Sequence, residues 1–516
     1  MFTSFTRKTH VIFSLLNKKE ERKHAQMKIH TQLQLRLPQP TIYGPKDYRI
    51  FREILSNIDR ILTESGMEDK LMISYFEEKG INDPTKYQYE HLQRCFRCGL
   101  LKILCELDYR EFSVRLADSC LYQWFTGYNT LGISNTPSKS TLERYCKMFS
   151  PETLNHVSIE LLKTISLPEQ STKLLYREEP VLVKDVFADS TCLKANIHFP
   201  VDWVLLRDGV RSLVKAISCI RKQGLKHRIC DPVIFFNNIN SLSIAMTSCR
   251  RKKDSNKHRK EILRKMKKLS KTVRDHGQRY RDLLDLQWAS TSWSRPQTEQ
   301  VLKRIDNVLE KLPAAIKQAH ERIIGERKIP SGEKILSLYD EHAHVIVRGK
   351  SGAEVEFGNG VYLAEQIDGL IVDWDIFEDQ PLSDSKIVAG SVKRIANNFG
   401  EFSSYTTDRG FSSSQNNILL EKMNIFNAIC PKSPKDLSVR LTDESFVKLQ
   451  KRRAQTEGRI GIFKNVFLGK PMRSQNFEVK KITVAWSVLT HNLWVMARIA
   501  MSEKEKEDPL YLRKAA

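Results

Sequence analysis

Three acidic residues stand where a metal-dependent reaction would need them. Asp189 follows an apolar, β-branched run, and Asp408 follows a second short run of strand-forming residues. Glu457 lies in a charged stretch with helical spacing. Three carboxylates that meet from two strands and a helix can hold two Mg²⁺ or Mn²⁺ ions, because these hard cations prefer oxygen ligands. Two such ions about 4 Å apart suit in-line displacement at phosphorus.

Cations flank the third of these acids. Arg453 lies four residues before Glu457 and Lys464 lies seven residues after it, so a helix would carry all three on one face. The cations would keep the carboxylate ionised and offer binding positions to phosphates. Gly458 and Gly461 each cost about 1 kcal/mol in a helix interior, which favours the close approach of another backbone or of DNA there.

Five other acids near predicted strand or helix ends are alternatives to these three. Asp185 is the main alternative to Asp189, because it lies an even number of positions away, on the same face of the strand. The others are Asp202, Asp208, Asp373 and Asp375.

The elements that must position these residues follow from apolar periodicity and turn signals. We expect a strand over 181–188 that ends at Asp189, and an antiparallel meander of short strands between 343 and 376. After it we expect a helix over 383–398, strands over 404–408 and 425–429 with a helix over 414–423 between them, and a helical stretch from Asp443 to 502 with a break around 469–471. This order predicts an α/β fold with one mixed sheet and flanking helices.

Helical spacing and changes of composition divide the rest of the chain. Residues 1–45 are predicted to form a basic flexible arm, 46–165 a helical domain, 203–340 a helical insertion, and 503–516 a tail. Ser140 and Ser150 are candidate caps for two short helices within the helical domain. Two short helices joined by a tight turn suit a helix-turn-helix DNA reader, but any small helical domain is built in the same way.

The centre of the insertion is strongly basic. Residues 250–274 hold 13 Lys or Arg against two acids, and apolar residues recur among them at helical spacing. The segment therefore predicts an amphipathic basic helix, and its charge is denser than solvation needs. We expect phosphate contacts that weaken steeply with salt.

The composition narrows the class of protein. The 516 residues carry a net charge of +23, which favours a polyanionic partner such as nucleic acid. No run of about 18 apolar residues occurs, so no membrane span is expected. Ten cysteines without dense, even spacing predict a reducing compartment, most simply the cytoplasm. Cys95 and Cys98 form a lone CxxC, which we interpret as buried thiols rather than a zinc site.

Taken together, these residues resemble a bacterial insertion-sequence transposase of the DDE class, whose catalytic domain has the ribonuclease H-like fold. The resemblance covers roughly 110–500. It rests on Asp189-Ser190-Thr191 followed by 196–202, on the segments 357–358 and 368–371, on Asp408-Arg409-Gly410-Phe411-Ser412-Ser413 and on the signature Arg453, Glu457 and Lys464. It implies a catalytic domain made of 175–202 and 341–502, with the insertion after its first strand.

The resemblance also implies the site and its partners. Asp189, Asp408 and Glu457 would hold two Mg²⁺ or Mn²⁺ ions, and the enzyme would cut transposon ends and join them to target DNA as a homodimer on paired ends, at the bacterial nucleoid. The family has a Tyr where this chain has Gln450, which puts one contact to the transposon end in doubt. Alternatives are a catalytically silent DNA-binding remnant and a ribonuclease H-like nuclease without strand transfer. The expected DNA contacts are Arg453, Lys464, Arg409, Arg250, Arg251, Lys252, Lys253, Arg264 and Lys268.

Overall fold

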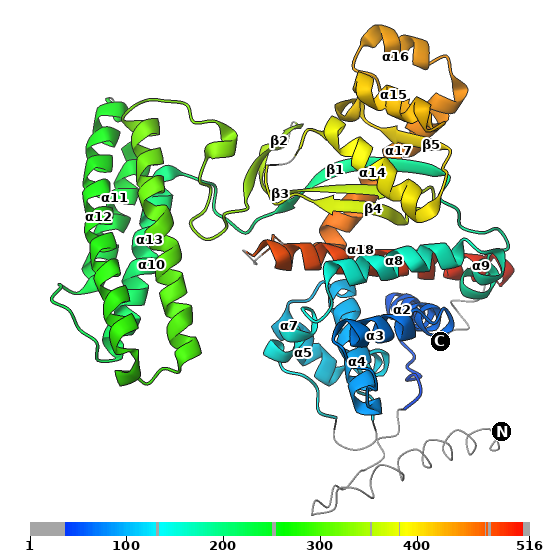
Figure 1. Cartoon of the computed structure of the whole chain (residues 1–516), viewed down its shortest axis with the longest axis horizontal. Coiled ribbons are helices and arrows are strands. Elements are labelled where there is room, and N and C mark those ends of the chain that lie inside the picture. The colour runs from blue at the N-terminus through cyan, green and yellow to red at the C-terminus, as the bar shows by residue number, and fades with distance from the viewer. Residues whose placement is uncertain are drawn as a thin grey trace, which may run out of the picture.

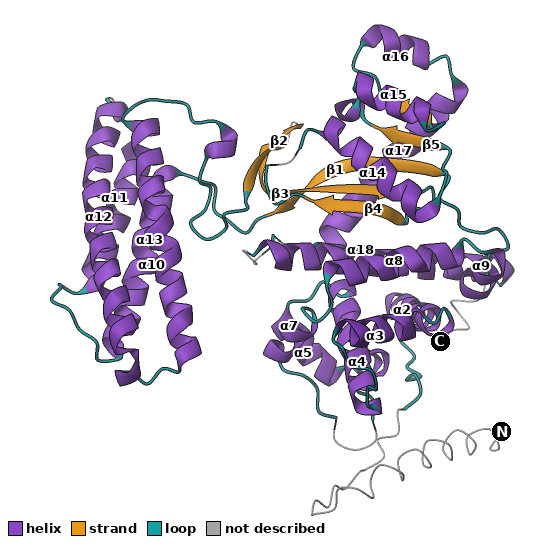
Figure 2. Ribbon diagram, viewed as in Figure 1, coloured by secondary structure: helices purple, strands orange, loops and turns teal. Residues whose placement is uncertain are grey.

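The computed structural model of the chain describes residues 37–130, 134–249, 254–350, 353–380, 382–469, 471–472 and 476–508. A mixed sheet with its helices forms the centre of the fold (Figure 1). A helical N-terminal block lies on one side of the sheet, and a bundle of long helices stands apart from both (Figure 2). The predicted α/β class is confirmed at this level.

The N-terminal block begins with a helix at Lys46, the residue at which the helical domain was predicted to start. Ser150 caps the last long helix of the block by accepting a hydrogen bond from Thr153 N, as expected. The cap predicted at Ser140 is wrong, because Ser138 lies at the N-cap and accepts from Thr141 N. The helices are α2 (Lys46–Glu64), α3 (Met67–Glu78), α4 (Lys86–Leu104), α5 (Tyr109–Asp118), α6 (Cys120–Thr126), α7 (Lys139–Tyr145), α8 (Pro151–Ile165) and α9 (Pro168–Leu175).

This block shares one apolar core with the sheet, since the last helix, α18 (Phe477–Glu507), packs against both. Figure 1 shows α18 and α8 running side by side between the sheet and the other N-terminal helices. Trp486 of α18 is buried, and its indole Nε1 donates to the carbonyl of Cys146 at 2.9 Å. The Trp374 indole likewise donates to Asn155 Oδ1 of α8 at 2.8 Å. The second helix of the candidate helix-turn-helix is therefore packed into the fold along much of its length.

The contact between Gly99 and Trp486 makes a stability prediction. A Cβ at Gly99 would lie 2.6–2.9 Å from three ring atoms of Trp486, a buried side chain held by its hydrogen bond to the carbonyl of Cys146. We expect Gly99→Ala to lower the free energy of unfolding by about 1–3 kcal/mol, the usual cost of overpacking. Gly458→Ala is the control, since a Cβ there meets nothing within 4 Å and a helical Ala gains up to about 1 kcal/mol. Urea unfolding measures both, and equal effects would contradict this account of the contact.

The sheet of the described residues has six strands in the order β2-β3-β1-β5-β6, with β4 also paired to β3. β1 (Asp185–Lys194) is central, antiparallel to β3 and parallel to β5. β5 is in turn parallel to β6, and β2 and β4 are antiparallel to β3, which confirms the predicted meander. The remaining strands are β2 (His344–Lys350), β3 (Ala353–Glu365), β4 (Ile371–Ile376), β5 (Ser404–Thr407) and β6 (Phe426–Ile429).

The first strand differs from its prediction. It runs from Asp185 to Lys194, so Asp189 lies in its middle and does not end it. The long strand β3 supplies ladder partners from Phe187 as far as Lys194. Those backbone hydrogen bonds keep the polar segment 189–191 extended, which the apolar pattern of the segment itself does not indicate.

The helices that were predicted after the meander begin and end close to their predicted positions, whereas one further helix, α16 (Pro434–Arg440), was not predicted. α18 continues to Glu507, so the segment 503–516 is not wholly a tail, and its last residues from 509 on lie outside the described part. The helices are α14 (Asp384–Phe399), α15 (Ser414–Lys422), α16 (Pro434–Arg440) and α17 (Glu444–Ile462), with a π-helical turn η5 (Phe463–Phe467).

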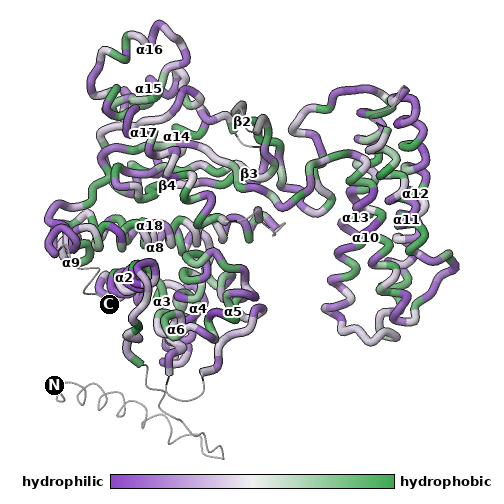
Figure 3. The backbone as a smooth tube through the Cα atoms, turned by 180° about the vertical axis from the view of Figure 1, so that it is seen from behind, coloured by the Kyte–Doolittle hydropathy of each residue, from purple (hydrophilic) through white to green (hydrophobic). Residues whose placement is uncertain are grey.

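The insertion follows β1, as predicted, and has a hydrophobic core of its own. Leu263, Met266 and Val273 of its basic helix are buried, so this helix is amphipathic as expected. In Figure 3 hydrophobic positions recur between hydrophilic ones along the insertion helices. These helices are α10 (Asp202–Lys222), α11 (Pro232–Ser248), α12 (Ser255–Gln287) and α13 (Arg295–Ile323).

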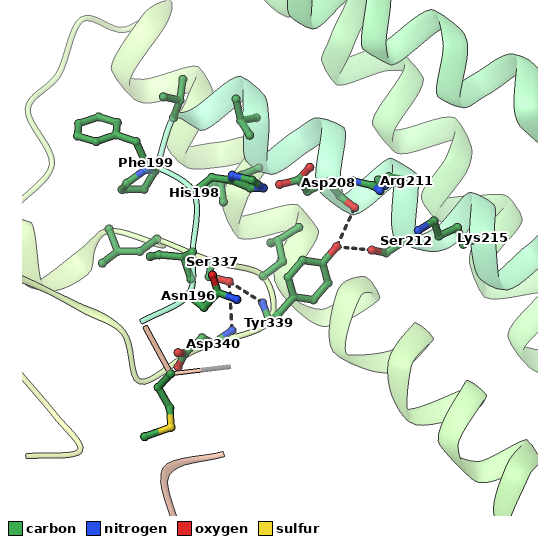
Figure 4. Close-up of a pocket in the computed structure, with 18 residues that line it drawn as sticks. Asn196, His198, Phe199, Asp208, Arg211, Ser212, Lys215, Ser337, Tyr339 and Asp340 are labelled. Atoms are coloured by element: carbon green, nitrogen blue, oxygen red, sulfur yellow. Dashed lines mark hydrogen bonds between the residues drawn. The ribbon is translucent and has the colours of Figure 1, made fainter. Parts of the chain in front are cut away.

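Polar contacts hold the insertion against the rest of the chain. The Tyr339 hydroxyl donates to the carbonyl of Asp208 at 3.0 Å and is hydrogen-bonded to Ser212 (Figure 4). The carboxylate of Asp340 accepts from Lys480 Nζ of α18 at 2.8 and 2.9 Å, in a buried ion pair. The segment that returns from the bundle is thereby fixed to the last helix.

None of the helices in the described ranges is both long enough and apolar enough to cross a membrane. Cys95 and Cys98 are buried free thiols, as predicted.

Candidate active site

The sheet brings Asp189 of β1 and Asp408, which directly follows β5, close to each other in the chain alignment of these two neighbouring strands. β1 and β5 are parallel, and Phe187 pairs with Thr406. Asp189 lies two residues beyond Phe187, and Asp408 lies two residues beyond Thr406 with an extended backbone (φ −76°, ψ 179°). Since alternate residues of a strand share a face, both carboxylates lie on the face of the sheet that carries Phe187 and Thr406.

Helix α17 covers this face. The guanidinium of Arg452 lies 4.6 Å from the ring centroid of Phe187, and the helix contacts β1, β5 and β6. Side chains that α17 turns towards the sheet near these strands therefore approach Asp189 and Asp408 from the same side. Asp189 and Asp408 are both half-buried.

Gln450 connects α17 by hydrogen bonds to the parallel strands β5 and β6. Its Nε2 donates to the carbonyl of Thr407 at 3.1 Å and to the carbonyl of Ala428 at 2.6 Å. Its Oε1 accepts from Arg453 Nε at 3.2 Å. Thr407 is the residue before Asp408, so Gln450 fixes the helix directly beside that carboxylate. From the sequence, position 450 is noted only because it lacks the Tyr of the family. The signal for its role in holding α17 to the strands is a long amide side chain one helical turn before Arg453.

Glu457 lies seven residues after Gln450, which is about two helical turns and the same side of α17. Its side chain is exposed. Within the described ranges, no group of three or more His, Cys, Asp or Glu side chains is placed so that it could hold a metal ion. The structure thus brings Asp189 and Asp408 to adjacent strand positions and Glu457 to the helix above them, without gathering the three side chains into one cluster.

A buried cluster anchors the middle of α17. Glu365 of β3 accepts from Thr456 Oγ1 at 2.8 Å and from Arg452 at 3.2 Å. Burial raises the pKa of the Glu365 carboxyl, although Thr456 and the nearby arginines oppose this effect. The cluster is contacted from α17 by Arg452, Thr456 and Arg459. A different side of α17 carries Arg453 and Glu457.

Lys464 lies beyond the end of the regular helix. α17 ends at Ile462, and Lys464 belongs to the π-helical turn, so the predicted continuous helical face stops short of it. Lys464 Nζ forms an ion pair with Glu356 at 3.2 Å, and Lys194 forms another with the same carboxylate. Burial opposes ionisation of Glu356, but Lys464 and Lys194 together lower its pKa below the usual value.

The alternative acids have other partners. Asp185 accepts a hydrogen bond from Ser404 Oγ at 2.5 Å. Arg394 pairs with Asp373 at 2.8 Å and contacts Asp375 at 3.7 Å. Asp202 is held by Arg322, and Asp208 by Arg207. The ion pairs of Asp202, Asp208, Asp373 and Asp375 suit structural roles.

Asp384 is a further acid near the site that the sequence does not single out. A Cβ built at Gly410 would lie 3.0 Å from Asp384 Oδ2 and 3.0 Å from Asp408 Oδ1, so the two oxygens lie at most about 6 Å apart. Gly410 N also donates to Asp408 Oδ1 at 2.8 Å. Asp384 opens α14, and only the packing of α14 on the turn after β5 brings it here.

The predicted DNA-binding cations are distributed over two regions. Arg409 is exposed directly after Asp408, and Arg453 is half-buried on α17. Arg264 and Lys268 are exposed on α12. The predicted contacts Arg250, Arg251, Lys252 and Lys253 lie outside the described residues.

Comparison of the chain with protein-family models, with curated proteins and with solved structures gives no match in any of the three. Function is therefore argued from the site and its surroundings.

Proposed function

We propose that the chain is a DNA transposase that cleaves and joins DNA ends by two-metal phosphoryl transfer. The observation that carries this proposal is the placement of Asp189 and Asp408, each two residues beyond the paired Phe187 and Thr406 of adjacent parallel strands, under a helix that carries Arg453 and Glu457. Carboxylates and cations in that arrangement suit the binding of divalent ions together with a phosphodiester.

The strand order supports a ribonuclease H-like sheet. A central strand, an antiparallel meander and then two parallel strands, each preceded by a helix, is the order that the family resemblance implies. The helical insertion after the first strand leaves this order intact, since it folds around its own core.

The residues of the site have separate tasks in this proposal. Asp189, Asp408 and Glu457 would hold two Mg²⁺ or Mn²⁺ ions, which supply charge stabilisation and an activated nucleophile when bound. Glu457 would join the two aspartates by turning its exposed side chain towards the sheet. Arg453 positions the scissile phosphate, since a guanidinium matches phosphate oxygens in pairs. Lys464 contributes positive charge to the DNA path beside Glu356.

Space and charge around α17 and α12 suit DNA. A Cβ at Gly458 or Gly461 meets nothing within 4 Å among the described residues, so packing within the chain does not explain these two glycines. They leave room for a DNA backbone beside α17, where Gly461 lies on the same side of the helix as Glu457. The exposed cations Arg264 and Lys268 extend the basic surface onto the insertion. The resemblance further suggests a homodimer on paired ends that acts in the bacterial cytoplasm.

The test of this proposal is cleavage and joining in one assay. Inverted repeats that flank the gene supply an end-bearing duplex, which is incubated with the protein, Mg²⁺ and a target plasmid. We expect nicked ends and joined end–plasmid products, both abolished by EDTA. Nicked ends without joined products would indicate a nuclease, and metal-independent DNA binding with neither product would indicate a catalytically silent remnant.

Gln450 provides a prediction about positioning. Gln450→Leu removes both donors to the strand ends while keeping an apolar side chain of similar size. We expect cleavage to fall by roughly 10–100-fold, the usual effect of removing a group that orients metal ligands. We also expect a higher Mg²⁺ concentration for half-maximal cleavage, because Glu457 is then less well placed.

The matched control is Gln455→Leu, on an exposed position of the same helix. It should leave the rate and the Mg²⁺ dependence unchanged. DNA binding without metal should be equal in all three proteins. A slower Gln450 variant with an unaltered Mg²⁺ dependence would contradict the positioning role.

A further inference from the structure

Two pockets flank the segment 199–201, which connects the sheet to the insertion. One is the pocket of Figure 4, between α10 and the return segment around Tyr339. The other, of about 500 Å³, lies between the start of α10, the start of α12 and the segment that follows α13. We refer to this second one as the basic pocket. It is lined by the cations Arg259, Arg322, Arg327, Lys328 and Lys334 and by the acids Asp202 and Glu326.

The positive charge of the basic pocket is largely uncompensated. The five cations and two acids of its lining leave a surplus of three positive charges. Asp202 forms an ion pair with Arg322 at 2.8 Å. Glu326 forms one at 2.7 Å with Lys260, a residue that does not line the pocket. The acids of the lining therefore have partners already, and the pocket attracts an anion.

Arg259 lines this pocket and carries an unmet hydrogen-bonding group. Its Nε is buried and has no hydrogen-bond partner among the described residues. Its guanidinium lies 5.3 Å from the ring centroid of the buried Trp203, which holds the side chain in place. A buried donor without an acceptor costs about 1–3 kcal/mol, and an oxygen of a bound anion would satisfy it.

An exposed aromatic ring forms the rim. Phe199 is 69% exposed, and its ring packs edge-on against Phe357 of β3 at 5.4 Å. Phe357 follows Glu356, the partner of Lys464, so the pocket lies at the end of β3 that Lys464 also reaches. A ring beside several cations suits a nucleotide unit, with the phosphate on the cations and the sugar or base on the ring.

We propose that the basic pocket binds a backbone phosphate of DNA at the junction of the insertion and the sheet. This inference rests on the proposed function for its choice of DNA. It adds a specific anchoring site in which Arg259 of α12 is joined by cations from the end of α13 and the segment that follows it. Through it, a duplex bound at the candidate active site also contacts the insertion.

The experiment measures binding of a labelled 40-base-pair duplex to the full chain between 50 and 300 mM KCl. Arg327→Ala combined with Lys328→Ala removes two exposed cations of the pocket. We expect the slope of log K against log salt to fall in magnitude by roughly 1, and binding at 100 mM salt to weaken by roughly tenfold, because the one lost phosphate contact removes about 0.9 from the slope. Arg259→Gln should weaken binding in the same direction.

The matched control is Lys303→Ala with Lys317→Ala, two exposed cations of the neighbouring helix α13. It removes the same total charge and should leave the slope unchanged within about 0.5. Equal losses in both double variants, or none in the pocket variant, would overturn the proposal.

A second arm separates DNA from free phosphate. Inorganic phosphate at millimolar concentration should raise the midpoint of thermal unfolding little in either protein. If it stabilises the wild type but not the pocket variant, while the DNA slopes are equal, the pocket binds the free ion and the proposal is wrong. Failure of the proposed function shows separately, as equal cleavage by wild type and Glu457→Gln with the slope difference intact.

Discussion

Glu457→Gln and Asp408→Asn are each expected to lower the rate of DNA cleavage by at least about a thousandfold. A neutral amide keeps the size of the carboxylate but removes the charge that holds a divalent ion. Loss of that charge removes several kcal/mol of transition-state stabilisation, and about 4 kcal/mol corresponds to a thousandfold. The measurement is single-turnover cleavage of an end-bearing duplex in Mg²⁺, with DNA binding measured separately in the absence of metal.

Asp185→Asn is the matched control for Asp189→Asn. Both residues belong to β1 and lie four positions apart on the same face. Asp185, however, accepts a hydrogen bond from Ser404 at the start of β5, away from Asp408. An Asn at 185 keeps that contact, so cleavage should stay within about threefold of wild type. Asp189→Asn should lose activity as Asp408→Asn does. Equal rates in the two β1 variants, or full activity of Glu457→Gln, would refute the site.

Lys480→Met is expected to lower the free energy of unfolding by about 3–5 kcal/mol. Lys480 is 1% exposed at its side chain, and its Nζ donates to both oxygens of Asp340 and to Asn359 Oδ1 at 2.8 Å. Methionine fills a similar volume, but it leaves the buried carboxylate of Asp340 without its counter-charge. That uncompensated charge causes the large loss, which urea unfolding of the full chain would measure.

The neighbouring Lys481 supplies the comparison. Its ion pair with Glu152 lies at the surface, with side chains 35% and 68% exposed, so Lys481→Met should cost at most about 1 kcal/mol. Lys480→Met combined with Asp340→Leu should recover much of the loss, since an apolar pair removes the buried charge altogether. A double variant as unstable as Lys480→Met alone would show that the damage comes from packing.

The fold illustrates how far local patterns reach. The helix starting at Lys46 and the amphipathic basic helix α12 were predicted, because capping, periodicity and turn residues act over a few positions. The extent of β1 was not, since the polar residues 189–191 stay extended only through hydrogen bonds to β3. The shared core of the N-terminal block was also missed, because it depends on where α18 packs, more than 300 positions along the chain from α8.

For the candidate site, residue types and local spacing pointed to Asp189, Asp408 and Glu457, and their joint action stays a prediction. The amino-acid sequence alone determines which acids and flanking cations are present, that the insertion is basic, and that the chain carries a surplus of positive charge. Tertiary structure alone decided that Asp189 and Asp408 stand at matching strand positions, and that Gln450 fixes α17 beside them. The reason is physical: register between distant strands and the docking of a helix depend on hydrogen bonds and packing with residues far away in sequence, and no local pattern records them.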